Sequence, residues 1–314
     1  MFARIVGLAA CLSAAGCVAT AEEAMPVADV AASRYYPDRA ERGNSADFLA
    51  ACKDWDEWDK PAPPFQIFGN TFYVGTCGIS AILVVGEEGH VLIDSGTDTG
   101  ADVVLANIRA LGLDPRDVRY LLHSHEHFDH VGGHAKISAA TGATVIVSPE
   151  AVQVFVNGEA HPDDPQAGMH DAFAPVGKVR EIGDDETVKL GDLELTAHLT
   201  PGHSPGAMSW TWWACSLPGD PPVCRRVAYV DSLSPISADA YRFTEHSEAV
   251  AAFRTSIDTV RALPCDLLLT PHPSASDMLV RLREGGLLGQ GQCAAYADSI
   301  AKRLDARLAE EAGE

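Results

Sequence analysis

The sequence predicts one α/β domain of layered type, and three observations support this. Strand-like and helix-like patterns alternate along both halves of the chain, as in sheets that are covered by helices. Apolar residues make up 46% of the 314 residues, which is enough for a sizeable core. No internal repeat or low-complexity linker interrupts residues 48–314. We therefore expect a single domain over 48–314.

Apolar periodicity and turn residues define the expected elements of this domain. Its first half should hold strands over 71–75, 80–85 and 90–94, a helix over 100–111, a strand over 118–122, a helix over 131–141 and a strand over 144–147. A loop rich in Gly, Pro, Asp and His follows over 157–175. Its second half should hold two strands over 187–199, paired strands over 208–214 and 226–230, a helix over 245–263, a strand over 267–270 and a helix over 293–312.

The N-terminal residues have the pattern of an export signal. Arg4 precedes an apolar run over 5–15, which is too short to span a bilayer, so we expect no transmembrane helix. Ala19-Thr20-Ala21 has the pattern of a soluble cleavage site, whereas Ala15-Gly16-Cys17 resembles a lipobox that would leave a lipid anchor on Cys17. We predict a signal peptide over 1–21, an arm over 22–47 and a periplasmic location. A buried N-terminal helix is the less favoured alternative.

The charges and cysteines restrict the partners and the kinds of site. With 23 basic and 44 acidic residues the formal charge is −21, which disfavours nucleic acid as a partner. Of the eight cysteines, Cys11 and Cys17 lie in the predicted signal. The remaining six form an even set in an oxidising compartment and predict disulfides, with their pairing left open. No two have CxxC spacing, so a cysteine-only zinc site is not expected.

The stretch HSHEHFDH, residues 123–130, follows a predicted strand and carries four histidines and two acids. Histidines two apart in an irregular loop can direct both rings toward one ion, so His125 and His127 would share a metal. Asp129 and His130 would face a second metal. The neighbours His123 and His134 are expected to be hydrogen-bonded to the backbone and not to be ligands.

Two further histidines follow predicted strands in proline-containing turns. His203 lies in LTPGHSPG and His272 in LLLTPHP, where rigid loops would hold a ligand at little ordering cost. Imidazole and carboxylate ligands suit zinc or iron better than magnesium. The joint pattern predicts a metal site.

The segments HSHEHFDH, TPGHSPG and TPHP together resemble the metallo-β-lactamase superfamily, and more narrowly its subclass B3. Further similar stretches lie over 68–75, 78–84 and 229–237, so the likeness runs from about Cys52 to the C-terminal helix. The resemblance implies a four-layer αββα sandwich.

The resemblance also implies roles for particular residues. The first of two zinc ions would be bound by His125, His127 and His203, and the second by Asp129, His130 and His272. Ser232 stands where other subclasses have a cysteine ligand; Ser232 and Ser234 would bind the substrate carboxylate, with Asp231 a minor candidate ligand. Asp94 would lie behind a histidine of the first zinc, unless it only begins a turn with Ser95 and Gly96. The implied disulfides are Cys52–Cys77, Cys215–Cys224 and Cys265–Cys293.

The implied activity is a zinc-dependent opening of the β-lactam ring of penicillins, cephalosporins or carbapenems. The zinc ions would supply hydroxide at neutral pH, and Asp129 would orient it. We expect a monomer. The nearest alternative is another exported dinuclear-zinc hydrolase, a lactonase or a thioester hydrolase, because fold does not fix substrate. A zinc-storage lipoprotein is the non-enzymatic alternative, and an activity assay would distinguish it from a hydrolase.

Overall fold

The computed structural model describes residues 43–216 and 223–313. The predicted signal peptide with Cys17, and residues 22–42 of the predicted arm, lie outside the described residues. Helix α1 (Ser45–Ala51) begins within the predicted arm, where the side chain of Asn44 caps its first turn by accepting a hydrogen bond from the backbone N–H of Asp47. In the described part of the chain, no helix is both long and apolar enough to cross a membrane.

A seven-stranded sheet contains the first seven strands in the order β1-β2-β3-β4-β5-β6-β7. Their bounds are β1 Phe65–Phe68, β2 Thr71–Tyr73, β3 Ile82–Gly86, β4 Gly89–Ile93, β5 Val118–Leu122, β6 Thr144–Val147 and β7 Val179–Glu181. Neighbours are antiparallel from β1 to β4 and parallel from β4 to β7. The carboxyl ends of β4 and β5 therefore meet at one edge of the sheet.

A five-stranded sheet has the order β12-β11-β10-β9-β8. Its strands are β8 Thr187–Leu190, β9 Leu193–Leu199, β10 Met208–Cys215, β11 Cys224–Tyr229 and β12 Leu267–Leu269. Both β9 and β11 are antiparallel to β10, and β12 is parallel to β11. Strands β9, β11 and β12 thus run in the same direction and also end at a common edge.

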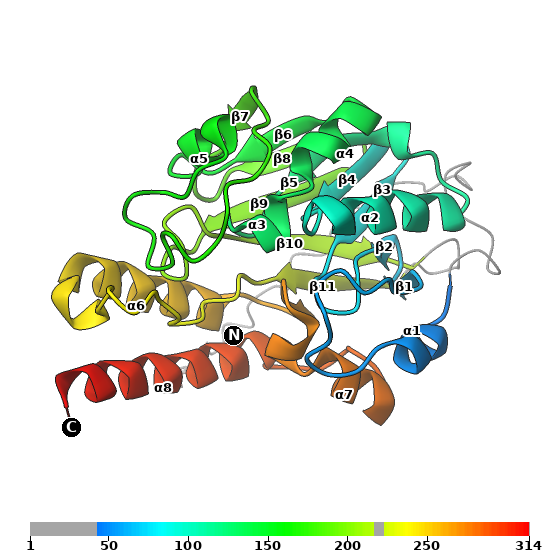
Figure 1. The fold of residues 1–314 in the computed structure, drawn as a ribbon. Coiled ribbons are helices and arrows are strands. Elements are labelled where there is room, and N and C mark those ends of the chain that lie inside the picture. Colours follow the sequence, from blue (N-terminus) through cyan, green and yellow to red (C-terminus); the bar gives the residue numbers. More distant parts are fainter. Residues whose placement is uncertain (1–42, 217–222, 314) are drawn as a thin grey trace, which may run out of the picture. The chain divides into compact units, whose positions relative to one another are not determined.

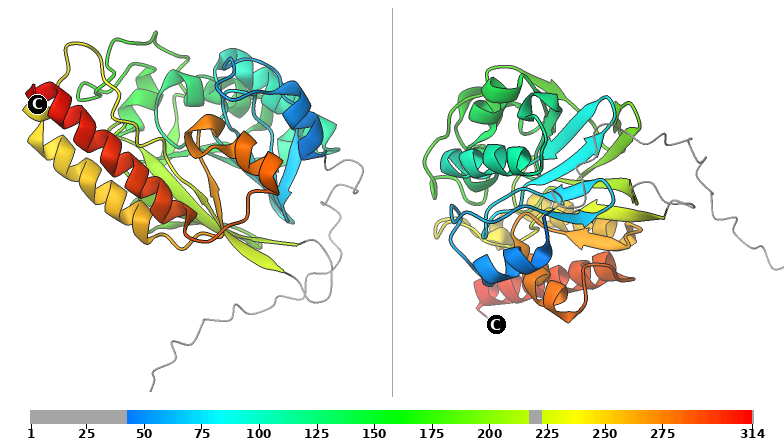
Figure 2. Two further views of the ribbon diagram at one scale, coloured as in Figure 1. Left: turned by 90° about the horizontal axis from the view of Figure 1, so that it is seen from below. Right: turned by 90° about the vertical axis from the view of Figure 1, so that its right-hand side faces the viewer.

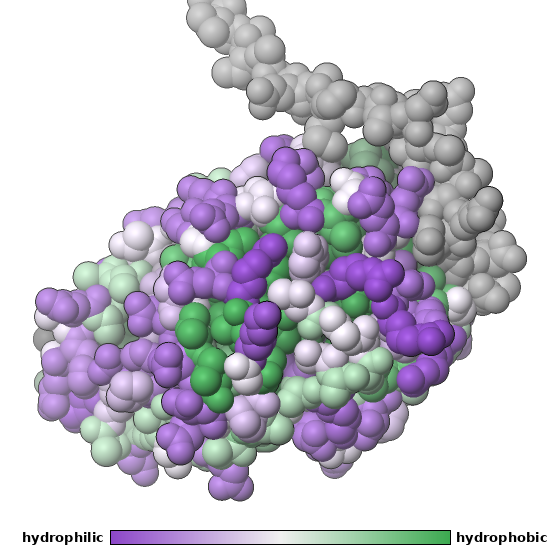
Figure 3. All heavy atoms as spheres, turned by 90° about the horizontal axis from the view of Figure 1, so that it is seen from above, coloured by the Kyte–Doolittle hydropathy of each residue, from purple (hydrophilic) through white to green (hydrophobic). Residues whose placement is uncertain are grey.

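Helices cover the outer face of each sheet (Figure 1, Figure 2). The α-helices after α1 are α2 Asp98–Ala110, α3 Phe128–Val131, α4 His134–Thr141, α5 Val152–Asn157, α6 Ser247–Ala262, α7 Met278–Glu284 and α8 Gln292–Ala312. Short 3₁₀ turns are η1 Pro115–Asp117, η2 Phe243–Glu245 and η3 Pro273–Ser276. Hydrophilic side chains occupy much of the face that lies uppermost in Figure 1 (Figure 3), as expected for helices whose apolar sides point inward.

Three separate apolar cores fill the spaces between four layers. The central core joins Tyr73 of one sheet to Trp210 of the other. A second core contains Val104 of α2 and lies against the seven-stranded sheet. The third contains Phe253 of α6 and Ile300 of α8, against the five-stranded sheet. The predicted αββα sandwich is confirmed.

Strand β3 shows why the central strands are apolar without interruption. Its side chains alternate between two cores: Ile82 and Val84 lie in the central core, whereas Leu83 and Val85 lie in the core beneath α2. A strand that is buried on both faces needs an apolar residue at every position.

The predicted strands and helices agree with the structure except for several short elements and for one helix that begins later than predicted. Predicted strands 118–122 and 144–147 match β5 and β6 in both bounds. The predicted helix over 131–141 begins only at His134, as α4, because Gly132 and Gly133 separate it from the short helix α3. At Gly133 the backbone passes so close to α2 that a Cβ would lie 2.6 Å from the Cβ of Ala101. Elements that were not predicted are the short segments α1, β1, α3, α5, β7 and α7 and the 3₁₀ turns η1, η2 and η3.

The structure contains the three disulfides that the resemblance implies. They are Cys52–Cys77, Cys215–Cys224 and Cys265–Cys293. The last one joins the segment before β12 to the first turn of α8, so it fixes the start of α8 beside the strand that leads to His272.

Candidate metal centre

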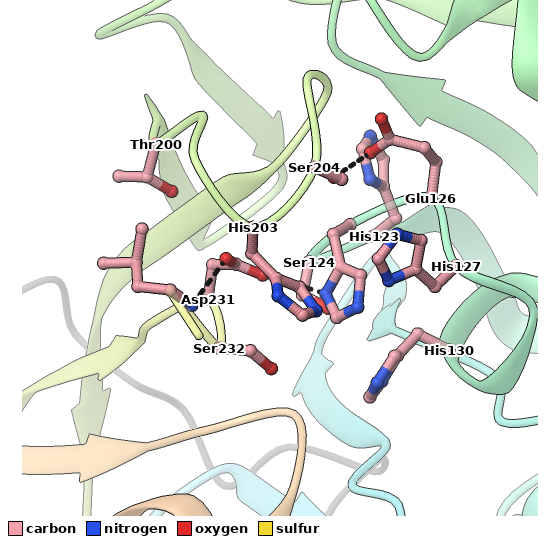
Figure 4. A network of polar contacts seen from close by, with 12 residues as sticks. His123, Ser124, Glu126, His127, His130, Thr200, His203, Ser204, Asp231 and Ser232 are labelled. Carbon is pink, nitrogen blue, oxygen red and sulfur yellow. Dashed lines mark hydrogen bonds and ion pairs between the residues drawn. The ribbon is translucent and has the colours of Figure 1, made fainter. Parts of the chain in front are cut away.

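Loops from both sheets meet where their strands end. The loop after β5 carries His125 and His127, and the loop after β9 carries His203. The backbone N–H of Met208, at the start of β10, donates to the carbonyl of Ser124 at 2.6 Å and ties the two sheets together here. The common direction of β9, β11 and β12 places the residues after all three strands at the same edge. Figure 4 shows the side chains that gather there.

Three histidines form a first cluster. One ring nitrogen from each of His125, His127 and His203 lies within 4.8 Å of the others, and all three side chains are buried. This is the set that the resemblance assigns to the first metal.

Asp129, His130 and His272 form a second cluster next to the first. The Oδ2 atom of Asp129 lies 3.0 Å from Nε2 of His130 and 3.4 Å from Nε2 of His272. The two Nε2 atoms are 3.2 Å apart. His125 also lies within 4.8 Å of Asp129 and His130, so the two clusters adjoin.

Most of these histidines use one ring nitrogen to contact a protein acceptor and direct the other toward the cluster. The contacts are His125 Nδ1 with Asp231 Oδ1 at 2.8 Å, His127 Nε2 with Asp164 Oδ2 at 3.0 Å, His203 Nδ1 with the Ser234 carbonyl at 2.8 Å and His272 Nδ1 with the Gly78 carbonyl at 3.3 Å. The other nitrogen of His125, Nε2, is buried and has no hydrogen-bond partner among the described residues. Hydrogen-bond acceptors behind His127, His203 and His272 fix the tautomers of these three rings, as is usual for metal-binding histidines.

Two acids lie behind the histidines, and Asp94 reaches His125 of the first cluster only through the hydroxyl of Ser124, whose oxygen is 3.3 Å from Nδ1 of His125. Asp94 contacts no histidine of the first cluster directly; its Oδ1 accepts from the Ser124 backbone N–H and its Oδ2 from the Ser124 and Tyr229 hydroxyls, each at 2.7 Å. Its Oδ2 is instead 3.7 Å from Nδ1 of His130, in the second cluster. Asp231 contacts His125 through Oδ1, while its Oδ2 accepts from a backbone N–H, so it lies behind a ligand and not among the ligands.

The charges within the ligand set favour a cation. Burial lowers the pKa of His125 and of His203 well below the usual range, so both rings are neutral. Burial would raise the pKa of Asp129, but the positive charge of His130 outweighs it and holds that pKa well below its usual range. Burial opposes the charge on His130 as well, yet Asp129 raises its pKa to about 10. A proton on His130 therefore balances a carboxylate that a metal ion could balance instead.

Binding of a divalent metal ion at the second cluster should release about one proton at pH 7. His130 is protonated below its pKa of about 10, and only the neutral ring ligates metal. Affinity for this metal should therefore increase as pH rises toward that pKa. Isothermal titration calorimetry in buffers of different ionisation enthalpy counts the protons; a count of zero at pH 7 would contradict the coupling.

Together these observations show that the chemistry of the two adjoining clusters fits metal binding. Five imidazoles and one carboxylate supply neutral nitrogen donors and one negative charge, a set suited to zinc. Three of the rings are hydrogen-bonded to acceptors behind them, and the buried Nε2 of His125 has no hydrogen-bond partner among the described residues. The predicted ligands His125, His127, His203, Asp129, His130 and His272 are all brought together.

Glu126 connects the two loops that supply the first cluster. Its Oε2 accepts from the hydroxyl of Ser204 at 2.6 Å and its Oε1 from the backbone N–H of Gly206 at 2.7 Å, and the first contact is visible in Figure 4. A Cβ at Gly206 would lie 2.8 Å from Oε2 of Glu126, so glycine permits this close approach. The contacts hold the His203 loop against the loop of His125 and His127.

Replacing Glu126 with Ala should weaken metal binding at the first cluster by roughly 10–100-fold, a loss typical of residues that orient ligands. Glu126→Gln should retain most of the affinity, because an amide can accept from Gly206 and donate to Ser204. Competition with a chromogenic chelator measures the affinity. Glu150→Ala, at an exposed position, is the matched control. Equal affinity of the Ala and Gln variants would contradict a positioning role.

A pocket of about 560 Å³ opens beside both clusters. His203 and His272 line it on the metal side, and Ser232 and Ser234 lie on its wall. The hydroxyl oxygen of Ser232 is buried and has no hydrogen-bond partner among the described residues, whereas Ser234 Oγ accepts from Arg303 at 2.9 Å. The two predicted substrate-binding serines therefore share one cavity with the metal ligands.

Several residues of the site were not predicted from the sequence. They are Glu126, Asp164, Gln166, Tyr229 and Arg303. Asp164 and Gln166 lie in the irregular segment 157–175, where neither periodicity nor a neighbouring strand indicates which side chains turn inward. The extra histidines are structural, as expected: His123 Nε2 accepts from the Ser148 backbone N–H at 3.2 Å, and His134 Nε2 contacts the Leu122 carbonyl at 3.2 Å.

Comparison with known proteins identifies similar chains of known structure. A family model described as the metallo-β-lactamase superfamily matches residues 74–211. The MIM-2 metallo-β-lactamase is 52% identical with a TM-score of 0.80, over 85% of this chain and 98% of that one. MIM-1 from Novosphingobium pentaromativorans is 49% identical with a TM-score of 0.82, over the same shares. MEM-A1, a subclass B3 metallo-β-lactamase from a soil metagenome library, is 38% identical with a TM-score of 0.77, over 82% and 99%.

Curated relatives with other activities match a smaller part. A hydroxyacylglutathione hydrolase from Anaeromyxobacter dehalogenans (strain 2CP-C) is 33% identical over 49% of each chain. The N-acyl homoserine lactonase AttM from Agrobacterium fabrum (strain C58 / ATCC 33970) is 30% identical over 50% of this chain and 55% of its own. The chain thus spans about half the length of the curated relatives that it matches.

One assignment follows from the four layers, from the two clusters of candidate ligands and from alignments that cover nearly the full length of similar solved structures. The chain belongs to the metallo-β-lactamase superfamily, a group of metal-dependent hydrolases, and is most like the members of its subclass B3.

Proposed function

We propose that the protein is a zinc-dependent hydrolase that opens the β-lactam ring of penicillins, cephalosporins or carbapenems. The observation that carries the proposal is the pocket in which two buried serines share the lining with the candidate ligands His203 and His272. Similar proteins also support the proposal, because the chain aligns with 98% of the MIM-2 metallo-β-lactamase at 52% identity.

Two zinc ions per chain would be held by the two clusters. His125, His127 and His203 would hold the first, and Asp129, His130 and His272 the second. Bound zinc supplies a water whose pKa is lowered from ~15.7 to about 7, together with a Lewis acid for the substrate carbonyl.

The side chains of the protein would then position the reactants. The Asp129 carboxylate would accept a hydrogen bond from the attacking water and so orient it. Ser232 and Ser234 would donate their hydroxyl protons to the carboxylate of the substrate. Asp231 and Asp164 would keep the rings of His125 and His127 in the required tautomers.

A lactonase or a thioester hydrolase is the second candidate. It is favoured by the two curated relatives, which are a lactonase and a hydroxyacylglutathione hydrolase. Their alignments cover about half of the chain, whereas those with metallo-β-lactamases cover 82–85% of it. We therefore rank β-lactams first.

We also propose that the chain is exported to the periplasm and acts there as a monomer. The support is the export-like pattern of residues 1–21 and the pairing of the six cysteines outside that segment into disulfides. Mass spectrometry of the membrane and soluble fractions would distinguish cleavage after Ala21 from lipidation of Cys17.

The substrate class is tested by offering the purified zinc-loaded protein four compounds in parallel. These are a carbapenem, a chromogenic cephalosporin, an N-acyl homoserine lactone and a glutathione thioester. We expect kcat/KM to be highest for the two β-lactams. A higher value for the lactone or the thioester would transfer the assignment to that class.

A further inference from the structure

One face of α8 is hydrogen-bonded to residues 232–237, which we call the serine segment. The Tyr296 hydroxyl donates to the Ser232 carbonyl at 2.8 Å, Arg303 donates to Ser234 Oγ at 2.9 Å, and Arg307 donates to Ser237 Oγ at 2.9 Å. Positions 296, 303 and 307 are seven and four residues apart, and such spacings lie on one side of a helix. The contacts of α8 therefore extend along the serine segment.

Arg303 differs from the other arginine of this helix. Arg307 has a carboxylate partner, Glu311, at 2.7 Å. Within the described ranges no carboxylate lies within ion-pair distance of Arg303, whose guanidinium donates to the hydroxyl of Ser234. Its guanidinium is exposed and lines the same pocket as Ser232, Ser234 and the ligand histidines. In a chain with a formal charge of −21, this is a cation without a counterion beside the ligand cavity.

The direction of the hydrogen bond determines what Ser234 can do. Because Arg303 donates to Ser234 Oγ, that oxygen acts as the acceptor and the proton of the hydroxyl stays available for another group. The Ser232 hydroxyl is 97% buried, lines the same pocket and has no partner among the described residues. One wall of the pocket therefore offers several hydrogen-bond donors, which are the hydroxyls of Ser232 and Ser234 and the remaining N–H groups of Arg303.

The second basic side chain on the pocket is Lys53. The one acid on its lining, Asp56, is already engaged: its Oδ2 lies 2.7 Å from the ammonium of Lys60. The net field on this wall is therefore positive, and the wall is suited to a carboxylate.

We propose that Arg303 is a specificity-determining residue, which adds a positive charge to the carboxylate-binding wall already assigned to Ser232 and Ser234. The resulting subsite makes the protein selective for anionic substrates over their neutral esters. This inference rests on the proposed function only for the identity of the substrate, whose anionic group Arg303 would bind. Arg303 supplies the charge that two serines cannot supply, because hydrogen bonds to charged groups are about twice as strong as neutral ones.

The test compares an acid with its own ester, so that only the negative charge differs. The first readout is KM and kcat for a chromogenic cephalosporin and its methyl ester, with Arg303→Met, Arg303→Lys and the wild type. We expect Arg303→Met to raise KM for the acid by roughly 10-fold or more, with kcat, the zinc content and KM for the ester unchanged. Arg303→Lys should raise KM for the acid less than Arg303→Met does, since lysine keeps the positive charge but cannot form the paired hydrogen bonds of a guanidinium with a carboxylate.

A second readout does not require turnover. Mercaptoacetate and its methyl ester each carry a thiol, which binds zinc, and their affinities for the zinc-loaded protein are compared by calorimetry. The wild type should prefer the acid, and Arg303→Met should lose this preference. Arg254→Met is the matched control, because Arg254 pairs with Asp305 on the outside of α6 and α8, away from the pocket. Thermal unfolding of both variants shows whether either loses stability.

The outcomes separate this subsite from the proposed function. If the wild type prefers the anionic thiol and Arg303→Met does not, the subsite is supported even when no β-lactam is hydrolysed. If β-lactams are hydrolysed but Arg303→Met affects acid and ester alike, or affects neither, the subsite is overturned while the proposed function stands.

Discussion

Replacing Asp129 with Asn is expected to lower kcat/KM for β-lactams by roughly 10²–10⁴-fold, the range that an acid–base residue contributes. The Asp129 carboxylate lies 3.0 Å from Nε2 of His130 and 3.4 Å from Nε2 of His272. An amide of the same size supplies no charge to balance a cation there and is a poor acceptor for the proton of the attacking water. Steady-state hydrolysis of a chromogenic cephalosporin, with zinc content by mass spectrometry, measures both effects.

The control for this change is Asp102→Asn, at an exposed position that pairs with Lys136 on the surface. That variant should keep its activity and its zinc. If Asp129→Asn kept even half of the wild-type kcat/KM, the role given to this carboxylate would be wrong.

Removing the Cys265–Cys293 disulfide should lower the free energy of unfolding by about 3–4 kcal/mol. The two cysteines are 28 residues apart, and the estimate follows from the entropy that the closed loop removes from the unfolded chain. The double variant Cys265→Ser, Cys293→Ser avoids a free thiol. Urea unfolding, followed by tryptophan fluorescence without reductant, measures the change.

The Cys215–Cys224 pair provides the comparison. It closes a loop of only 9 residues, so its removal should cost less, about 2–3 kcal/mol. Because α8 holds the serine segment through Tyr296 and Arg303, loss of the bond at Cys293 should also raise KM, whereas loss of Cys215–Cys224 should not. Equal effects of the two removals on KM would contradict this link.

The parts of the fold and site that the sequence predicts are those with a strong local signal. Strands such as β5 and β6 are buried apolar runs, and their bounds follow from the sequence directly. The ligand histidines come directly after such strands, or sit in proline turns that follow them, so strand ends locate them. The sequence alone therefore indicates the six candidate ligands, which the fold brings close together.

The parts that could not be predicted depend on contacts between distant segments. Asp164 and Gln166 come from an irregular loop, and only the fold brings Asp164 against His127, 37 residues away. Arg303 lies on an ordinary amphipathic helix, and nothing local distinguishes it from Arg307. The way in which Asp94 lies behind His125 also depends on distant contacts: its carboxylate accepts from the Ser124 hydroxyl, whose oxygen is 3.3 Å from Nδ1 of His125, and from Tyr229.

The most direct test of the proposed activity is to remove all metal from the purified protein with a chelator and to add zinc back stepwise while following hydrolysis of a carbapenem. We expect no hydrolysis after chelation, and a recovery that levels off at two zinc ions per chain. Hydrolysis that survives chelation, or its absence with two zinc ions bound, would contradict a zinc-dependent β-lactamase.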